Sequence, residues 1–113
     1  MNNFNDKNVL EIEFHQSMLR IYKLAKEDCQ YTPTRFLQMV QEYGGLKTAK
    51  RLLANQEMQS GLTTLWECGR MDLSMEALVI NPKYQPLFTE AEIETARARL
   101  ASYGFIENGQ SAT

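Results

Sequence analysis

This chain has few of the histidine and cysteine residues that most often serve in nucleophilic catalysis and metal binding. It contains one histidine, His15, and two cysteines, Cys29 and Cys68. Nucleophilic catalysis needs a base and an orienting group near the nucleophile, and a zinc site needs several ligands at characteristic spacings. Neither pattern is present. We therefore expect His15 to border a helix stripe, both cysteines to be free thiols, and no metal or other cofactor.

Carboxylates are the remaining candidates for catalysis. Glu67, Asp72 and Glu76 cluster around a turn near Trp66 and Arg70, and paired carboxylates can act as general acid and base. Helix capping or an ion pair with Arg70 explains the same residues. No glycine precedes a Lys-Ser/Thr pair at the spacing of a phosphate-binding loop. We therefore predict that the protein is not an enzyme.

Basic residues gather in the first half of the chain. The segment from Arg20 to Arg51 carries seven basic and three acidic residues, although the net charge is −2. Helix-turn-helix proteins contact DNA phosphates with basic side chains on and beside their second helix. The exposed face of an amphipathic helix is also charged, so nucleic-acid binding is the alternative hypothesis. Its candidate residues are Arg35, Lys47, Lys50 and Arg51.

The segment 31–53 must position this basic face. Thr32 and Pro33 are suited to begin a helix, as cap and first helical residue, and the apolar residues that follow repeat at helical spacing. Gly44 and Gly45 are expected to end this helix, because glycine readily adopts a left-handed backbone. A second amphipathic helix should then run to Leu53, which makes a central helix–Gly-Gly–helix pair.

A long helix is expected from about Val9 to Asp28. Asn8 is expected to cap it, since Glu11 follows at the spacing of a capping box. Its main apolar stripe runs through Leu10, Phe14, Met18, Ile21 and Ala25. Ile12 and Leu19, seven residues apart, lie on another face. That face either packs within the domain or contacts a partner, so Ile12 and Leu19 are the candidate partner-binding residues.

Local signals in the second half predict short helices and one long one. Ser74 is placed to cap a helix that Asn81-Pro82 ends, and Gly69 is placed to end the helix before it. Thr89 and Glu92 have the spacing of a capping box, and they should begin a helix with Ile93, Ala96, Leu100 and Tyr103 buried.

These elements predict an all-α fold, a compact bundle of five or six helices. We expect residues 1–7 to be a flexible N-terminus, residues 8–105 a single domain, and residues 106–113 a disordered tail. The predicted core comprises Phe14, Met18, Ile21, Phe36, Met39, Val40, Leu53, Leu65, Trp66, Leu78, Ile93 and Leu100.

The sequence also bears on location. Residues 1–8, MNNFNDKN, lack the charged and apolar regions of a signal peptide. No apolar run approaches the roughly 20 residues of a bilayer span. We therefore expect a cytoplasmic protein with no membrane association.

Four segments carry a resemblance to a known pattern: YTPTRFLQM, GGLKTAKRLL, GLTTLWECGRMDLSMEALV and LFTEAEIETARARL, within residues 31–100. They resemble a small uncharacterised bacterial all-helical domain, found alone or at the ends of larger proteins, some of them nuclease-like and associated with defence loci. The resemblance implies an accessory or interaction module and supplies no catalytic motif. It favours nucleic-acid binding by association alone.

Taken together, these observations give one leading hypothesis and one alternative. The leading hypothesis is a non-enzymatic helical interaction module, which binds another protein or itself. It rests on the extra apolar line at Ile12 and Leu19, the uneven charge and the absence of a catalytic pattern. The alternative is a nucleic-acid-binding accessory protein that uses the basic helix around Lys47–Arg51.

Overall fold

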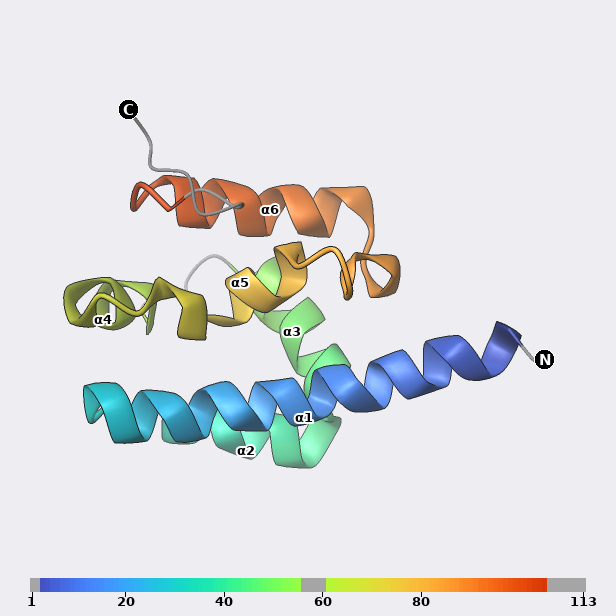
Figure 1. Cartoon of the computed structure of the whole chain (residues 1–113), viewed down its shortest axis with the longest axis horizontal. Coiled ribbons are helices and arrows are strands. Elements are labelled where there is room, and N and C mark those ends of the chain that lie inside the picture. Colours follow the sequence, from blue (N-terminus) through green and yellow to red (C-terminus); the bar gives the residue numbers. More distant parts are fainter. Residues whose placement is uncertain (1–2, 56–60, 106–113) are drawn as a thin grey trace.

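The computed structural model describes residues 3–55 and 61–105. Within these ranges the chain forms six α-helices, two single-turn 3₁₀ helices and no strand, which confirms the predicted all-α bundle (Figure 1). In chain order the elements are α1 (Asn3–Cys29), α2 (Thr34–Tyr43), α3 (Gly45–Ala54), α4 (Gly61–Cys68), η2 (Met71–Leu73), α5 (Met75–Ile80), η3 (Gln85–Leu87) and α6 (Glu90–Ala101). The predicted disordered tail lies outside the described residues.

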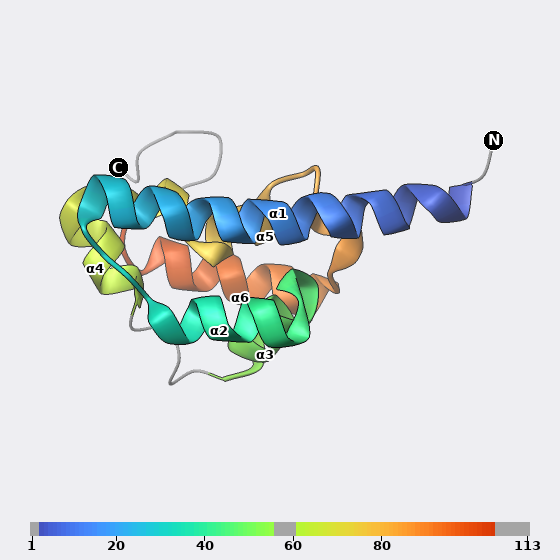
Figure 2. The ribbon, with the colours of Figure 1, turned by 90° about the horizontal axis from the view of Figure 1, so that it is seen from below.

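Helix α1 is the longest element, and it packs against α2, α3, α4 and α5. Its first turns extend beyond the rest of the molecule (Figure 2). Residues 6–12, at this end of the helix, are here called the arm; one face of the arm still meets the body, since Leu10 packs against the core. The helix begins at Asn3 and therefore within the segment expected to be flexible. The predicted cap at Asn8 is wrong, because Asn8 lies inside the helix.

A tight turn between α2 and α3 reverses the chain as predicted, but its two glycines have different roles. Gly44 has a φ of +88° and separates the helices. Gly45 is instead the first residue of α3, where a Cβ atom would lie 2.7 Å from the His15 Cα atom. Because such a contact is too short, only glycine lets α3 approach α1 this closely. Helix α2 begins one residue later than predicted, with Pro33 at the capping position.

The predicted signals at the ends of the short helices are confirmed. Gly69 follows α4 with a φ of +76°. The Ser74 side chain caps α5 by accepting a hydrogen bond from the Ala77 N–H at 3.1 Å. Helix α5 ends at Ile80, directly before Asn81-Pro82. Local chemistry therefore determines where these helices begin and end.

Helix α6 begins with the complete capping box that the sequence predicts. The Thr89 hydroxyl accepts from the Glu92 N–H at 3.1 Å, and the Glu92 carboxylate accepts from the Thr89 N–H at 2.9 Å. The same carboxylate accepts from the Lys50 ammonium at 2.7 Å. Partial burial raises the pKa of Glu92, but the hydrogen bonds from Lys50 and Thr89 outweigh it and leave the pKa below its usual value.

The core lies between α1 and the α5–α6 pair. Most of the predicted core residues are buried, and Phe36, Met39 and Leu78 are partly buried against them. The prediction that Trp66 belongs to the core is wrong, since Trp66 is 52% exposed and packs on Tyr103 at the surface. Trp66 lies on α4, an eight-residue helix at the edge of the bundle. The opposite face of α4 is the buried one, through Leu62 and Leu65. Phe14 and Met18 are fully buried at the centre.

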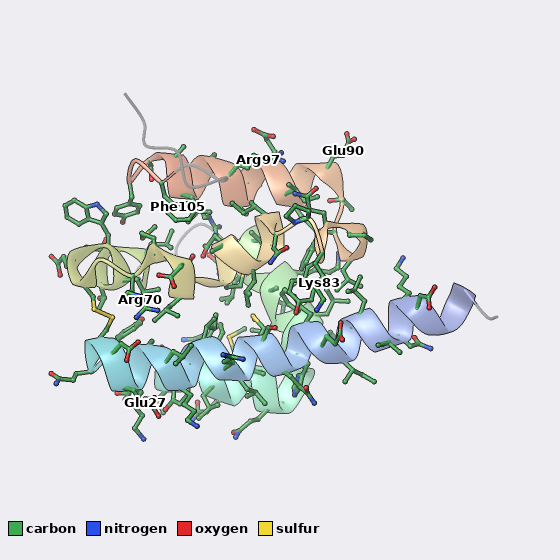
Figure 3. The ribbon with its side chains drawn as sticks, in the orientation of Figure 1. Glu27, Arg70, Lys83, Glu90, Arg97 and Phe105 are labelled. Carbon is green, nitrogen blue, oxygen red and sulfur yellow. A yellow bond between two sulfur atoms is a disulfide. The ribbon has the colours of Figure 1, made fainter. Side chains whose placement is uncertain are left out.

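The prediction of two free thiols is also wrong. Cys29, the last residue of α1, and Cys68, the last residue of α4, form a disulfide with their Cα atoms 5.8 Å apart (Figure 3). Beside it, the Arg70 guanidinium donates to the carboxylates of Asp28 and Asp72. These contacts join α4 to the C-terminal end of α1.

Candidate functional site

Two of the four candidate nucleic-acid-binding residues are engaged within the domain. Lys50 pairs with Glu92 of α6, and its ammonium lies 5.2 Å from the centre of the Phe88 ring. The Arg51 guanidinium lies 4.2 Å from the centre of the Tyr43 ring. Lys50 therefore turns toward α6 and Arg51 toward the end of α2. Their charges contribute to contacts that hold the helices together.

The other two basic candidates are exposed. Arg35 lies in the first turn of α2 and Lys47 in the first turn of α3. Within the described residues, the structure records no ion pair for either side chain. Each phosphate contact adds one salt-dependent increment to nucleic-acid affinity. Two separated positive charges can contact few phosphates, so they would add little affinity.

The two candidate partner-binding residues have different surroundings. Ile12 is 59% exposed on the arm, whereas Leu19 is partly buried and packs against the core. Val9, one helical turn before Ile12, is 52% exposed. The exposed apolar surface on α1 is therefore formed by Val9 and Ile12 on the arm. Sequence reasoning missed Val9, although its three-residue spacing from Ile12 was a sufficient signal.

A shallow hollow adjoins the arm. It has a volume of about 380 Å³ and lies where α1 meets the α2–α3 turn. Its lining residues are Asn8, Glu11, Ile12, His15, Gly44, Gly45 and Leu46. The arm thus combines two exposed aliphatic side chains with an adjacent recess. A partner side chain can enter such a recess while the partner backbone runs along the helix.

His15 has a structural contact in this region. Its Nδ1 atom accepts a hydrogen bond from the Gly45 N–H at 2.9 Å, and so it satisfies one of the free N–H groups at the start of α3. The predicted position at the edge of the α1 stripe agrees with its partial burial. The contact fixes α3 against α1 at the base of the arm.

The acidic cluster near Arg70 does not assemble as one site. Asp72 pairs with Arg70 at 3.0 Å, as the sequence allowed, and Glu67 is exposed on α4. Glu76 instead enters the core and pairs with Arg99 at 3.1 Å, where both side chains are 6% exposed. Carboxylates facing different surroundings cannot share one substrate as acid and base.

The Glu76–Arg99 pair connects α5, α6 and the end of α3. The Arg99 guanidinium donates to the Glu76 carboxylate and also to the carbonyl oxygens of Leu53 and Asn55. Burial raises the pKa of Glu76, although the hydrogen bond from Arg99 acts in the opposite direction. No pattern in the sequence predicts this pair, because its members are 23 residues apart on different helices.

Glu76 also lines a cavity with a volume of about 550 Å³. Its walls come from α1, α2, the end of α3, α4 and the η2–α5 segment. Most of the lining side chains are apolar, including Ile21, Ala25, Phe36, Met39, Leu62 and Leu65. Tyr31 stands in the same wall, and burial raises its pKa. The cavity and the arm lie at different ends of α1.

The part of the chain that the structure describes contains no group of three or more His, Cys, Asp or Glu residues placed to hold a metal ion. None of the described helices has both the length and the apolar character needed to cross a membrane.

No family model, curated protein or solved structure matches this chain. The resemblance to a small bacterial helical domain therefore stays a prediction. The candidate sites depend on the geometry of this chain alone.

Proposed function

We propose that this protein is a non-enzymatic interaction module that binds another protein, or a second copy of itself, through the arm. The observation that supports the proposal is the exposure of Val9 and Ile12 on a helix end that projects from the body (Figure 2). Removing such side chains from water contributes about 25 cal/mol per Å² of apolar surface to a complex, before the entropic cost of association is subtracted. The adjacent hollow provides a recess for a complementary side chain.

The test uses affinity capture from the native host with three forms of the tagged protein. In Val9→Ser/Ile12→Ser the arm loses its apolar side chains. The matched control, Tyr43→Ser/Trp66→Ser, removes the two other large apolar side chains that are exposed in the described part of the chain. The proposal predicts that a partner held by the wild type, or a dimer seen by sedimentation, is lost in the arm variant and retained in the control.

Two outcomes would contradict the proposal. One is equal recovery of the same partner by the wild type and the arm variant. The other is a wild-type protein that stays monomeric at high concentration and retains no partner. Loss in the control variant alone would place the interaction at Tyr43 or Trp66 and away from the arm.

Nucleic-acid binding is the second candidate, and the exposure of Arg35 and Lys47 supports it. Replacement of both by Glu should abolish a salt-sensitive mobility shift with DNA or RNA. Lys50→Glu is a poor test, because it places a carboxylate beside Glu92 and disturbs the start of α6. An unchanged shift in the Arg35→Glu/Lys47→Glu variant would exclude this surface.

The location of the protein belongs with these proposals. The Cys29–Cys68 disulfide is typical of an oxidising compartment, whereas the sequence pattern predicted the cytoplasm. Alkylation of thiols immediately on lysis of native cells decides between them. Two labelled cysteines would support the cytoplasmic location, and unlabelled cysteines would support an oxidising compartment.

A further inference from the structure

We propose that the cavity lined by Glu76 binds a small, neutral and mainly apolar molecule that donates one hydrogen bond. An aromatic compound with a single N–H or O–H group is the chemical class that fits. The cavity lies away from the arm, so this site is independent of the protein-binding surface.

The volume and lining of the cavity support a ligand site. Pockets for small molecules have volumes of about 300–1,000 Å³ and apolar walls with a few polar groups, and this cavity of about 550 Å³ lies within that range. Five elements contribute to its wall, from α1 to α5.

Glu76 determines which polar group the ligand should carry, because its carboxylate can accept a hydrogen bond. It is the charged residue that is buried among the lining side chains, whereas Arg35 is exposed. Arg99 donates to its Oε2 atom. A carboxylate can accept up to about four hydrogen bonds, so a donor on the ligand adds to the bond from Arg99. The site therefore favours a ligand with an N–H or O–H group.

The charge balance around Glu76 disfavours ionic ligands in the buried part of the cavity, whereas Arg35, the other charged lining residue, is exposed to solvent. The Arg99 guanidinium already compensates Glu76 within the core, so a ligand ammonium would bring a second positive charge to one carboxylate. A ligand carboxylate would face Glu76 directly. Burying an uncompensated charge is strongly unfavourable, and a neutral ligand avoids this cost.

The experiment titrates the wild-type protein with indole, which is apolar, neutral and has one N–H donor. Binding is followed by backbone amide shifts in a two-dimensional NMR spectrum. Saturable shifts should appear around Ala25, Phe36 and Leu65 and be absent from the arm. 1-Methylindole carries a methyl group in place of the N–H hydrogen, so it lacks the donor and should bind about tenfold more weakly. Indole-3-acetate, an anion, should also bind more weakly than indole.

A pair of variants tests the position of the ligand. Ala25→Leu adds apolar bulk to the cavity wall from α1 and should weaken indole binding at least tenfold. Ala98→Leu makes the same change on an exposed position of α6 and should leave binding unchanged. Thermal unfolding of both variants shows that each is folded.

Three results would overturn the proposal. They are the absence of saturable shifts in the wild type up to the solubility limit of indole, equal affinities for indole and 1-methylindole, and unchanged binding in folded Ala25→Leu. If Ala25→Leu does not fold, the comparison of indole with 1-methylindole on the wild type still decides whether Glu76 receives the donor.

Discussion

The two halves of α1 belong to one continuous helix, but their apolar side chains have opposite surroundings. In the part that other helices cover, here called the covered half and beginning at Phe14, Phe14 and Met18 are fully buried. In the arm, Val9 and Ile12 are more than half exposed. Figure 1 shows why, since other helices cover α1 along its middle and C-terminal end and leave its N-terminal end projecting. Helix geometry is common to both halves, so packing alone makes the difference.

This contrast separates apolar residues that stabilise the folded domain from apolar residues that do not. Burial of Phe14 stabilises the domain, and its ring packs edge-on against Tyr84 and Phe88 at centroid distances of 5.2 and 5.3 Å. Ile12 contributes little to such a core. Burial within the domain does not account for this aliphatic pair, which is exposed on a projecting helix end, and for this reason we propose the interaction there.

The largest expected effect on stability comes from replacing Phe14 in the covered half of α1. Phe14→Ala should lower the free energy of unfolding by about 3–5 kcal/mol, because it leaves a cavity beside two aromatic rings. Urea denaturation measures the change, and Phe14→Leu is the conservative control. A loss below about 1 kcal/mol would show that the covered half is not the core and would remove the contrast.

Removal of the disulfide tests how strongly it holds α4 against the C-terminal end of α1. Replacing both cysteines by Ser should cost about 2–4 kcal/mol, because the bond restricts the unfolded chain over a sequence separation of 39 residues. The measurement is the urea midpoint of the variant against the oxidised wild type. Equal midpoints would mean that Arg70 and the packing of α4 suffice to hold this end.

His15 lies at the start of the covered half, next to the boundary with the arm. Gly45→Ala should cost about 1–3 kcal/mol, since the added methyl group would meet the α1 backbone and push α3 away. Gly44→Ala measures backbone strain separately from packing, because nothing lies within 4 Å of its Cβ position, while its φ of +88° and ψ of 159° should cost alanine about 1–3 kcal/mol. Thermal unfolding measures both variants. A loss below about 0.5 kcal/mol in Gly45→Ala would argue against close packing of α1 and α3.

The pH dependence of stability tests whether Lys50 belongs to the fold. The pKa of Glu92 is lowered in the folded state, so the unfolded chain takes up this proton first. The contribution of Glu92 is present above its unfolded pKa of about 4.3 and is lost as the pH falls through the lower folded value. Glu92→Gln should therefore show a shallower loss of stability below about pH 5, amounting to about 1 kcal/mol or less. Identical pH profiles for the wild type and Glu92→Gln would show that the Lys50–Glu92 pair does not stabilise the fold. Lys50 would then return to the candidate nucleic-acid-binding residues.

The smallest effect on stability is expected in the arm. Val9→Ser/Ile12→Ser should change the free energy of unfolding by about 0.5 kcal/mol or less, because exposed positions contribute little to folding. A loss comparable to that of Phe14→Ala would mean that the arm is covered in the isolated domain. The contrast between the halves of α1 would then be false.

The sequence predicted the features that depend on neighbouring residues. The capping box of α6, the cap at Ser74 and the stop at Gly69 follow from side chains within four residues of each helix end. Helix stripes predicted most of the core for the same reason.

Contacts between distant residues could not be predicted. Cys29 meets Cys68, and Glu76 meets Arg99, only because the helices pack in one particular arrangement. The exposure of Trp66 has the same origin, since α4 turns its other face inward. At the candidate sites, the sequence identified Ile12 but placed Leu19 with it, because periodicity does not show where a helix leaves the body of the domain.

The most direct test of the arm as a protein-binding surface is site-specific photo-crosslinking in the native host. A benzophenone amino acid replaces Ile12 in one variant and exposed Ala98 of α6 in the control. We predict a discrete adduct from position 12, with another protein or with a second copy, and none from position 98. No adduct at position 12, or the same products at both positions, would contradict the account.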